Sequence, residues 1–331
     1  MIIRTIDAHT AGEPLRLIVD GFPRLEGETI LEKRDYIRDH YDHLRRALML
    51  EPRGHADMYG ALFTEPERDS SHAGVLFMHN EGFSTMCGHG VIAVVTIAIE
   101  RGLLVTAGDG HERPIVLDSP AGQIHASATV NGATVDSVRF RNVPSFVLHP
   151  AVPVRLGSRD VLADVAFGGA FYAIVDSEAA GIPIVPGRLP DLRRAGMAIK
   201  HAVEAAVRVE HPNEPGLQGI YGTIFTGPPS SDAAHLRNVT IFADAEVDRS
   251  PCGTGTCAVM AVLSAMQLLS PGHRFTHESI IGTAFRGRVL EETAVGDIPA
   301  IVPEIEGEAY ITGENTFVID ERDPLRYGFR L

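Results

Sequence analysis

The chain has 331 residues, of which 44% are hydrophobic, and a formal net charge of −14 at pH 7. This length exceeds the usual size of a single domain, so it predicts two domains with a sizeable core. The acidic balance argues against a broad basic surface for nucleic acid or anionic lipid, and the apolar stretches are too short for a membrane span. The first residues lack the basic and apolar regions of a signal peptide, so we expect a cytoplasmic protein.

Short strand-like runs alternate with helix-like segments along the chain. Two segments, 91–101 and 256–269, are apolar and free of proline and glycine, and a longer polar helix is expected over 189–209, ahead of HPNEPG. Turns containing Gly, Pro and Asp separate the strand-like runs, which are AGVLFMH (73–79), SVRFRNV (137–143), VLADVAF (161–167), FYAIVD (171–176), NVTIFAD (238–244) and EAYITG (308–313). The sequence therefore predicts an α/β (α+β) fold rich in strands.

The two halves of the chain repeat a cysteine motif. Cys87 in MCGHGVIAVV and Cys252 in SPCGTGTCAVM share the pattern C-G-x-G-x-x-A-V and lie 165 positions apart, half of the chain length. This spacing predicts a duplication in which each half-domain carries one cysteine. We expect an N-terminal half-domain over 1–125, completed by 305–331, and a C-terminal half-domain over 126–304.

Each of the two cysteines stands at the predicted start of an apolar helix. A helix N-terminus exposes unpaired N–H groups and a partial positive charge, so it can lower the pKa of a thiol toward neutrality. Gly88 and Gly253 follow the thiols and let a carboxylate approach the backbone amides. Two such thiols suit inversion at a carbon: one thiolate removes the proton α to a carboxylate, and the other thiol returns a proton to the opposite face.

Motifs along essentially the whole chain resemble the proline racemase family. They are AHTAGEP (8–14), LEPRGHADMYGAL (50–62), MCGHG (86–90), FGGAFYAIV (167–175), DRSPCGTG (248–255), GTAFRG (282–287) and DPLRYGF (323–329). The resemblance implies a fold like that of diaminopimelate epimerase, with two similar α/β domains, an active site in the cleft between them and assembly as a homodimer.

The resemblance also implies roles for individual residues. Cys87 and Cys252 correspond to the two catalytic thiols. His89 and Asp248 correspond to contacts of the substrate's imino group, and Phe242 corresponds to a wall that packs on the pyrrolidine ring. The residues that correspond to carboxylate binding are Gly88, Gly90, Gly253 and Thr254.

Simpler roles are possible for several of these residues. The two thiols could be buried structural cysteines, but their matching positions in a repeat favour chemistry. Cys257 stands where the family often has Ser, so we expect a small packed residue rather than a disulfide partner of Cys252. Cys87 and His89 lack the further ligands of a zinc site, and CGTGTC matches neither a dinucleotide nor a phosphate-binding pattern. We therefore expect neither a metal nor a cofactor.

The hydroxyl group of the substrate decides the outcome of α-proton removal from a cyclic imino acid. Proline racemises, 4-hydroxyproline epimerises at C2, and 3-hydroxyproline can lose water. In the family's trans-3-hydroxy-L-proline dehydratases the second thiol is commonly a threonine. Cys252 therefore favours a cofactor-independent racemase or epimerase of proline or hydroxyproline as the main prediction.

Two alternatives stay open. HNEGFSTMCGH, YGTIFT and FADAEVDRSP resemble the trans-3-hydroxy-L-proline dehydratases, and RGHAD (53–57) stands where the 4-hydroxyproline epimerases usually have RGSD. His55 is expected to fix a turn, and neither His55 nor Asp57 is counted among the catalytic residues. A dehydratase is the first alternative, and a non-catalytic protein that binds imino acids is the second.

Overall fold

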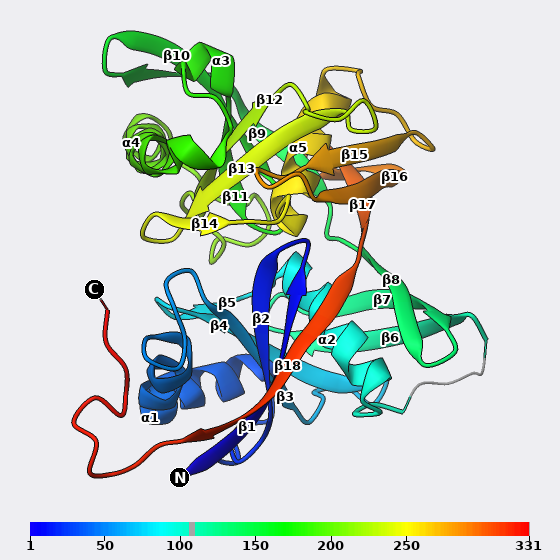
Figure 1. Ribbon diagram of the computed structural model, residues 1–331. Helices are drawn as coiled ribbons and strands as arrows, with labels where there is room; N and C mark the ends of the chain where they lie inside the picture. The colour runs from blue at the N-terminus through cyan, green and yellow to red at the C-terminus, as the bar shows by residue number, and fades with distance from the viewer. Residues whose placement is uncertain (106–109, 331) are drawn as a thin grey trace. The chain divides into compact units, whose positions relative to one another are not determined.

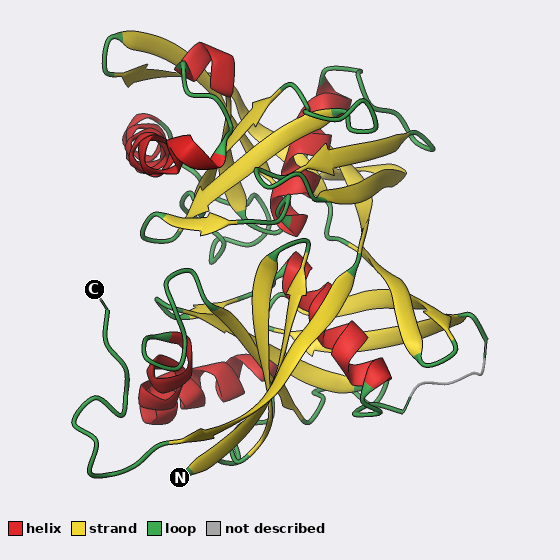
Figure 2. Cartoon of the chain, viewed as in Figure 1, coloured by secondary structure: helices red, strands yellow, loops and turns green. Residues whose placement is uncertain are grey.

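The computed structural model describes residues 1–105 and 110–330 of the chain. The chain divides into two compact units, one formed by Met1–Phe140 with Gly307–Leu331 and the other by Arg141–Glu306. Strands dominate both units, and each contains two long helices (Figures 1 and 2). The predicted fold class, a strand-rich α/β chain with two similar domains, is confirmed.

The first unit is a twisted sheet with two helices. Its strands pair in the order β18–β1–β2–β3–β4–β6–β7, antiparallel except for the parallel pairs β2–β3 and β4–β6, and β5 adds to β4. The elements are β1 (Ile2–Thr10), β2 (Glu13–Asp20), α1 (Ile30–Met49), β3 (Tyr59–Thr64), β4 (Ala73–His79), β5 (Phe83–Ser84), α2 (Gly88–Glu100), β6 (Glu112–Ser119), β7 (Gly122–Asn131), β8 (Thr134–Arg141) and β18 (Ala309–Val318).

The second unit repeats this arrangement. Its strands pair in the order β9–β10–β11–β12–β13–β15–β16–β17, with parallel pairs at β11–β12 and β13–β15, and β17 returns to pair with β9. β14 adds to β13 as β5 adds to β4. The elements are β9 (Ser145–Leu156), β10 (Arg159–Phe167), β11 (Phe171–Asp176), α3 (Ser177–Ala180), a 3₁₀ turn (Pro186–Arg188), α4 (Leu189–Ala206), β12 (Gly222–Gly227), β13 (Leu236–Phe242), β14 (Glu246–Asp248), α5 (Gly253–Ala265), β15 (Arg274–Glu278), β16 (Ala284–Val295) and β17 (Ile298–Gly307).

The repeat extends to the helices. Parallel neighbours need a crossover connection, and in each unit the first crossover carries an outer helix, α1 or α4, while the second carries an apolar helix, α2 or α5. The strand order therefore contains the duplication that the cysteine spacing predicts. The expected boundary after residue 125 falls inside β7, which pairs with β6 as far as Thr129. Because that hairpin is continuous, residues 126–140 belong to the first unit.

α2 and α5 are buried on all sides. Residues 88–98 of α2 and 253–262 of α5 are all buried, and each helix contacts several strands of its own unit. A helix that is apolar all round is stable only inside a core. Both helices begin three residues earlier than predicted, at Gly88 and Gly253, so that each cysteine is the N-cap residue. α5 also ends four residues early, because Gln267 adopts φ 61° and stops the helix as Gly102 does after α2.

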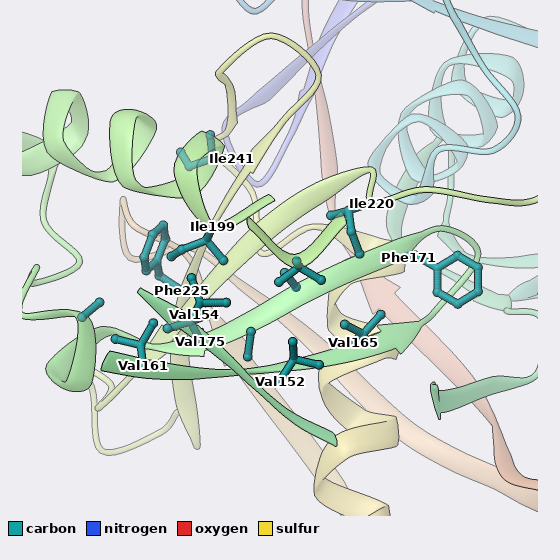
Figure 3. Packing of buried hydrophobic residues seen from close by; sticks show 14 of the residues in the cluster. Val152, Val154, Val161, Val165, Phe171, Val175, Ile199, Ile220, Phe225 and Ile241 are labelled. Carbon is teal, nitrogen blue, oxygen red and sulfur yellow. The ribbon is translucent and has the colours of Figure 1, made fainter. Parts of the chain in front are cut away.

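The outer helices α1 and α4 are amphipathic. α4, predicted over 189–209, buries Leu192, Ala195, Ile199 and Val203 in the core of the second unit. Figure 3 shows Ile199 in this core, with Phe225 and Val175. α1 has no counterpart among the predicted elements, although its start carries a capping box. Thr29 Oγ1 accepts from the Glu32 N–H, and the Glu32 carboxylate accepts from the Thr29 N–H. The six predicted strand-like runs all overlap strands of the structure.

Candidate active site

Cys87 caps the N-terminus of α2. Its backbone is extended (φ −146°, ψ 112°), and its Sγ accepts a hydrogen bond from the Gly90 N–H at 3.3 Å. The residue is 6% exposed, and His89 Nδ1 lies 3.3 Å from Sγ. A backbone N–H and an imidazole beside the sulfur are contacts that suit a cysteine general base.

Contacts from three other elements hold the turn that follows Cys87. Thr10 Oγ1, at the end of β1, donates to the His89 carbonyl at 2.9 Å, which brings the AHTAGEP motif to the site. The Tyr59 ring from β3 meets the imidazole edge-on, with centroids 4.8 Å apart. A Cβ at Gly90 would lie 2.6 Å from the Phe77 ring of β4, so close packing requires glycine there.

Cys252 has the same position at the start of α5 but a different backbone. Its φ of 63° with ψ of 112° is a conformation that residues other than glycine rarely adopt. The Cys252 N–H donates to Ser250 Oγ at 3.1 Å. Ser250 in turn donates to Asp248 Oδ1 from its N–H at 2.9 Å and from its hydroxyl at 2.6 Å. One serine therefore links a buried carboxylate to the backbone of the thiol.

Burial and charge decide the protonation of this second half-site. Burial raises the pKa of Asp248 to about 6, and the hydrogen bonds from Ser250 act in the opposite direction. Burial and then the Asp248 carboxylate raise the pKa of the Cys252 thiol to about 12, against the opposite effects of the Tyr172 hydroxyl and the Gly255 N–H. The expectation that a helix start lowers the pKa of both thiols is therefore wrong for Cys252, because desolvation and a like charge outweigh the helix N-terminus. This thiol is protonated at neutral pH.

An aromatic wall, formed by Tyr172, Tyr221 and Phe242, lies beside Cys252. The Tyr172 hydroxyl is 3.7 Å from Cys252 Sγ and 2.6 Å from Thr254 Oγ1. Tyr221 meets Tyr172 edge-on with centroids 5.8 Å apart and stacks on Phe242 at 5.5 Å. Phe242 was expected from the family pattern, whereas Tyr172 and Tyr221 were not. Tyr172 lies in FGGAFYAIV and Tyr221 in YGTIFT, two motifs that indicated only the family resemblance. The sequence feature that could have indicated a site role is a tyrosine hydroxyl beside an apolar strand.

The structure gathers the predicted site residues into two groups, one in each unit. Within each group every residue is buried, and Gly88 and Gly253 are the first residues of their helices. The backbone N–H groups of these first turns are the donors that a carboxylate ligand would use. The first group is Cys87, Gly88, His89 and Gly90, and the second is Phe242, Asp248, Cys252, Gly253 and Thr254.

The remaining candidates lie outside these groups. Cys257 is fully buried on α5, and all three cysteines are free thiols, so Cys252 and Cys257 form no disulfide. Burial raises the pKa of the Cys257 thiol well above its ordinary value. His55 donates from Nδ1 to the neighbouring Ala56 carbonyl at 2.7 Å, and Asp57 adopts φ 61° in the same loop. The Met58 N–H donates to the His55 carbonyl at 3.2 Å, which closes the turn expected at His55.

The described residues, 1–105 and 110–330, contain neither a cluster of metal ligands nor a membrane-spanning helix. No group of three or more His, Cys, Asp or Glu side chains within them is placed to hold a metal ion. No helix in this part of the chain combines the length and apolar character needed to cross a membrane.

Comparison with known proteins identifies the family. The family model described as proline racemase matches residues 5–330. The chain belongs to the proline racemase family. The resemblance inferred from the seven motifs is therefore confirmed, and the motif residues can be compared with proline racemase relatives of stated activity.

Two relatives of the proline racemase family match over nearly the whole chain. A trans-3-hydroxy-L-proline dehydratase of Bacillus cereus is 52% identical over 330 residues, which cover 100% of this chain and 98% of that protein. A 3-hydroxyproline 2-epimerase of Burkholderia multivorans is 45% identical over 328 residues, which cover 99% and 97%. The predicted main function and its first alternative, epimerase and dehydratase, are therefore the activities for which these relatives are named.

Solved structures confirm the predicted fold. A hydroxyproline epimerase from Agrobacterium vitis, with bound trans-4-OH-L-proline, superposes with a TM-score of 0.90 at 30% identity, covering 100% of this chain and 96% of that one. A phenazine biosynthesis protein of the PhzF family from Bacillus anthracis superposes with a TM-score of 0.61 at 11% identity, which shows a shared fold alone.

Proposed function

We propose that the chain removes the α-proton of a hydroxyproline with Cys87 as the base and Cys252 as the acid on the opposite face of the ring. The observation that carries this proposal is the difference between the two repeated thiols. Cys87 lies beside the His89 imidazole, whereas Cys252 is a protonated thiol near the Asp248 carboxylate. Inversion at carbon requires one base and one acid.

The reaction follows from these protonation states. The Cys87 thiolate takes the proton from Cα, and the electron pair of the C–H bond moves into the carboxylate to give an enediolate. The N–H groups of the first turns of α2 and α5, with the Thr254 hydroxyl, bind this group and stabilise its added charge. Cys252 then donates its proton to the other face of Cα, which restores the carboxylate. The reverse reaction exchanges the roles of Cys87 and Cys252.

Asp248 binds the ring ammonium in this proposal. Its carboxyl is ionised above a pH of about 6, and a buried carboxylate gains most from a cation that neutralises it. The ammonium also offsets the charge of Asp248 that raises the pKa of Cys252, so the bound substrate makes this thiol a better acid. When Cys252 has lost its proton, the Tyr172 hydroxyl and the Gly255 N–H are donors to the sulfur.

We infer 3-hydroxyproline as the substrate. The Bacillus cereus and Burkholderia multivorans relatives, at 52% and 45% identity, are both named for reactions of 3-hydroxyproline. The Agrobacterium vitis epimerase, whose structure holds trans-4-OH-L-proline, is 30% identical. The sequence departure at RGHAD points away from 4-hydroxyproline in the same way.

Dehydration is a second candidate outcome, favoured by the 52% identity to the Bacillus cereus dehydratase. In trans-3-hydroxy-L-proline the α-hydrogen and the hydroxyl lie on the same ring face, because each is opposite to the carboxylate. The thiol that removes the proton can therefore return it to the leaving hydroxyl, as the C2–C3 double bond forms and water departs. Dehydration needs Cys87 alone, whereas epimerisation needs both thiols.

A substrate panel in deuterated water tests the proposed function. L-proline, trans-4-hydroxy-L-proline and trans-3-hydroxy-L-proline are incubated separately with the enzyme and followed by NMR and optical rotation. We expect the third substrate to react fastest, giving its C2 epimer with deuterium at Cα together with some dehydrated product. Binding of an imino acid without deuterium exchange would instead identify a non-catalytic binding protein.

A further inference from the structure

The carbonyl of Pro251, the residue before Cys252, is held by two buried side chains. Asn238 Nδ2 on β13 donates to this oxygen at 2.7 Å, and Thr256 Oγ1 in the first turn of α5 donates at 3.0 Å. His277 Nδ1 on β15 lies 2.9 Å from Thr256 Oγ1. All three side chains are fully buried, so water does not compete for these bonds.

The His277 ring joins the two side chains that hold the Pro251 carbonyl. A threonine hydroxyl has one proton, and here it is directed to the Pro251 carbonyl. His277 Nδ1 lies 2.9 Å from Thr256 Oγ1 and 3.3 Å from Asn238 Nδ2, so it contacts both side chains that donate to this carbonyl. His277 Nε2 has no hydrogen-bond partner among the described residues. Burial lowers the pKa of His277 to about 3, so the ring stays neutral.

The backbone at Cys252 explains why such a network is needed. Its φ of 63° with ψ of 112° costs about 1–3 kcal/mol for a residue with a Cβ, and such a conformation persists only when its surroundings fix it. Cys87, the repeated counterpart, has φ −146° and needs no such support. The Pro251 carbonyl belongs to the peptide unit whose nitrogen is that of Cys252, so holding the carbonyl sets the position from which Sγ extends.

We propose that Asn238, Thr256 and His277 are positioning residues that hold the strained backbone at Cys252, so that its thiol can return the proton in epimerisation. This inference rests on the proposed two-thiol function. It predicts a selective defect: loss of the network impairs the step that uses Cys252 and spares the step that uses Cys87. A residue that served only the stability of the fold would affect both steps alike.

Thr256→Val and Thr256→Ser form the decisive pair of variants. Val keeps the shape of Thr but removes the hydroxyl, whereas Ser keeps the hydroxyl. Thr240→Val is a matched control, because Thr240 is fully buried in the same unit and its Oγ1 has no hydrogen-bond partner among the described residues. Asn238→Leu removes the other donor to Pro251 and is a second variant should Thr256→Val fail to fold.

The kinetic readout is the ratio of epimer to dehydrated product from trans-3-hydroxy-L-proline. For Thr256→Val and Asn238→Leu we expect kcat for epimerisation to fall about 10- to 100-fold with KM within about threefold, and dehydration to stay within about twofold. Thr256→Ser should restore epimerisation, and Thr240→Val should match wild type. An unchanged product ratio in both Thr256→Val and Asn238→Leu would overturn the inference.

A second readout does not depend on turnover. Iodoacetamide labelling followed by mass spectrometry gives the alkylation rate of each cysteine in the folded enzyme. Losing one buried hydrogen bond should increase the population of the open state of the Cys252 turn about tenfold. The alkylation rate of Cys252 should rise by the same factor, while that of Cys87 stays unchanged. If the wild-type protein exchanges no deuterium, the proposed function fails, but the labelling experiment still tests the hydrogen-bond network. Equal Cys252 alkylation rates in wild type and Thr256→Val would then reject the network.

Discussion

Replacing Asp248 with Asn should make the protein more stable and much less active. Burial raises the pKa of Asp248 from its ordinary value of 3.8 to about 6. The native state therefore holds this proton more tightly than the unfolded chain. Stability falls as the pH rises from about 4 to 6, and the full penalty, about 3 kcal/mol, is present above that range. An Asn at 248 avoids the penalty, and its Oδ1 can still accept the two hydrogen bonds from Ser250.

The activity of the same variant should change in the opposite direction. A buried carboxylate that pairs with the substrate ammonium contributes about 2–5 kcal/mol, so kcat/KM should fall by about 30- to several thousand-fold. In wild type, kcat/KM should also fall about tenfold per pH unit below a pH of about 6, because it reports the ionisation of the free enzyme. This acidic limb should be absent from any activity that Asp248→Asn retains.

Urea unfolding at pH 4 and pH 7.5 checks the predicted change in stability. Values of kcat/KM measured from pH 4.5 to 8 check the predicted change in activity. Asp248→Asn should exceed wild type in stability at pH 7.5 by up to about 3 kcal/mol and match it near pH 4. Asp244→Asn, an identical change at an exposed position four residues earlier, is the control. A variant that is less stable at pH 7.5, or that keeps the acidic limb of wild type, would refute this assignment of Asp248.

Three further predictions concern the thiols and their surroundings. Cys252→Ser should lose epimerisation but keep dehydration and α-proton exchange of trans-3-hydroxy-L-proline, whereas Cys87→Ser should lose all three, as read by NMR in deuterated water. Tyr172→Phe should raise the pKa of the Cys252 thiol further and slow epimerisation about 3- to 10-fold, measured from the pH dependence of alkylation and of kcat. Gly90→Ala should lower the unfolding free energy by about 1–3 kcal/mol, because its Cβ would lie 2.6 Å from the Phe77 ring.

Local sequence patterns predict the structural features that are determined by residues close together in the chain. The spacing of Cys87 and Cys252 reveals the duplication because a repeated structural unit repeats its sequence constraints. Apolar runs reveal α2 and α5 because a helix that is buried on all sides is apolar on all sides. α1 was missed although Thr29 and Glu32 form a capping box, since its surface-facing side is rich in charged residues and masks the apolar stripe.

Local sequence patterns could not predict the features of the site that depend on tertiary contacts. The pKa of Cys252 is set by burial and by Asp248, and the helix start visible in the sequence is the weaker influence. The positive φ of Cys252 has no local signal, since the residue is not glycine and its conformation depends on contacts from β13 and α5. Tyr172 reaches Cys252 only because β11 lies beside α5 in the folded unit.

The fate of the α-hydrogen tests the two-thiol account most directly. Trans-3-hydroxy-L-proline carrying deuterium at C2 is converted in ordinary water, and the C2 epimer is isolated early in the reaction and examined by mass spectrometry. The account predicts that the epimer carries hydrogen at C2, because the label leaves on Cys87 and the returning proton comes from Cys252. An epimer that retains the deuterium would show that one group removes and returns the same proton, and would contradict the account.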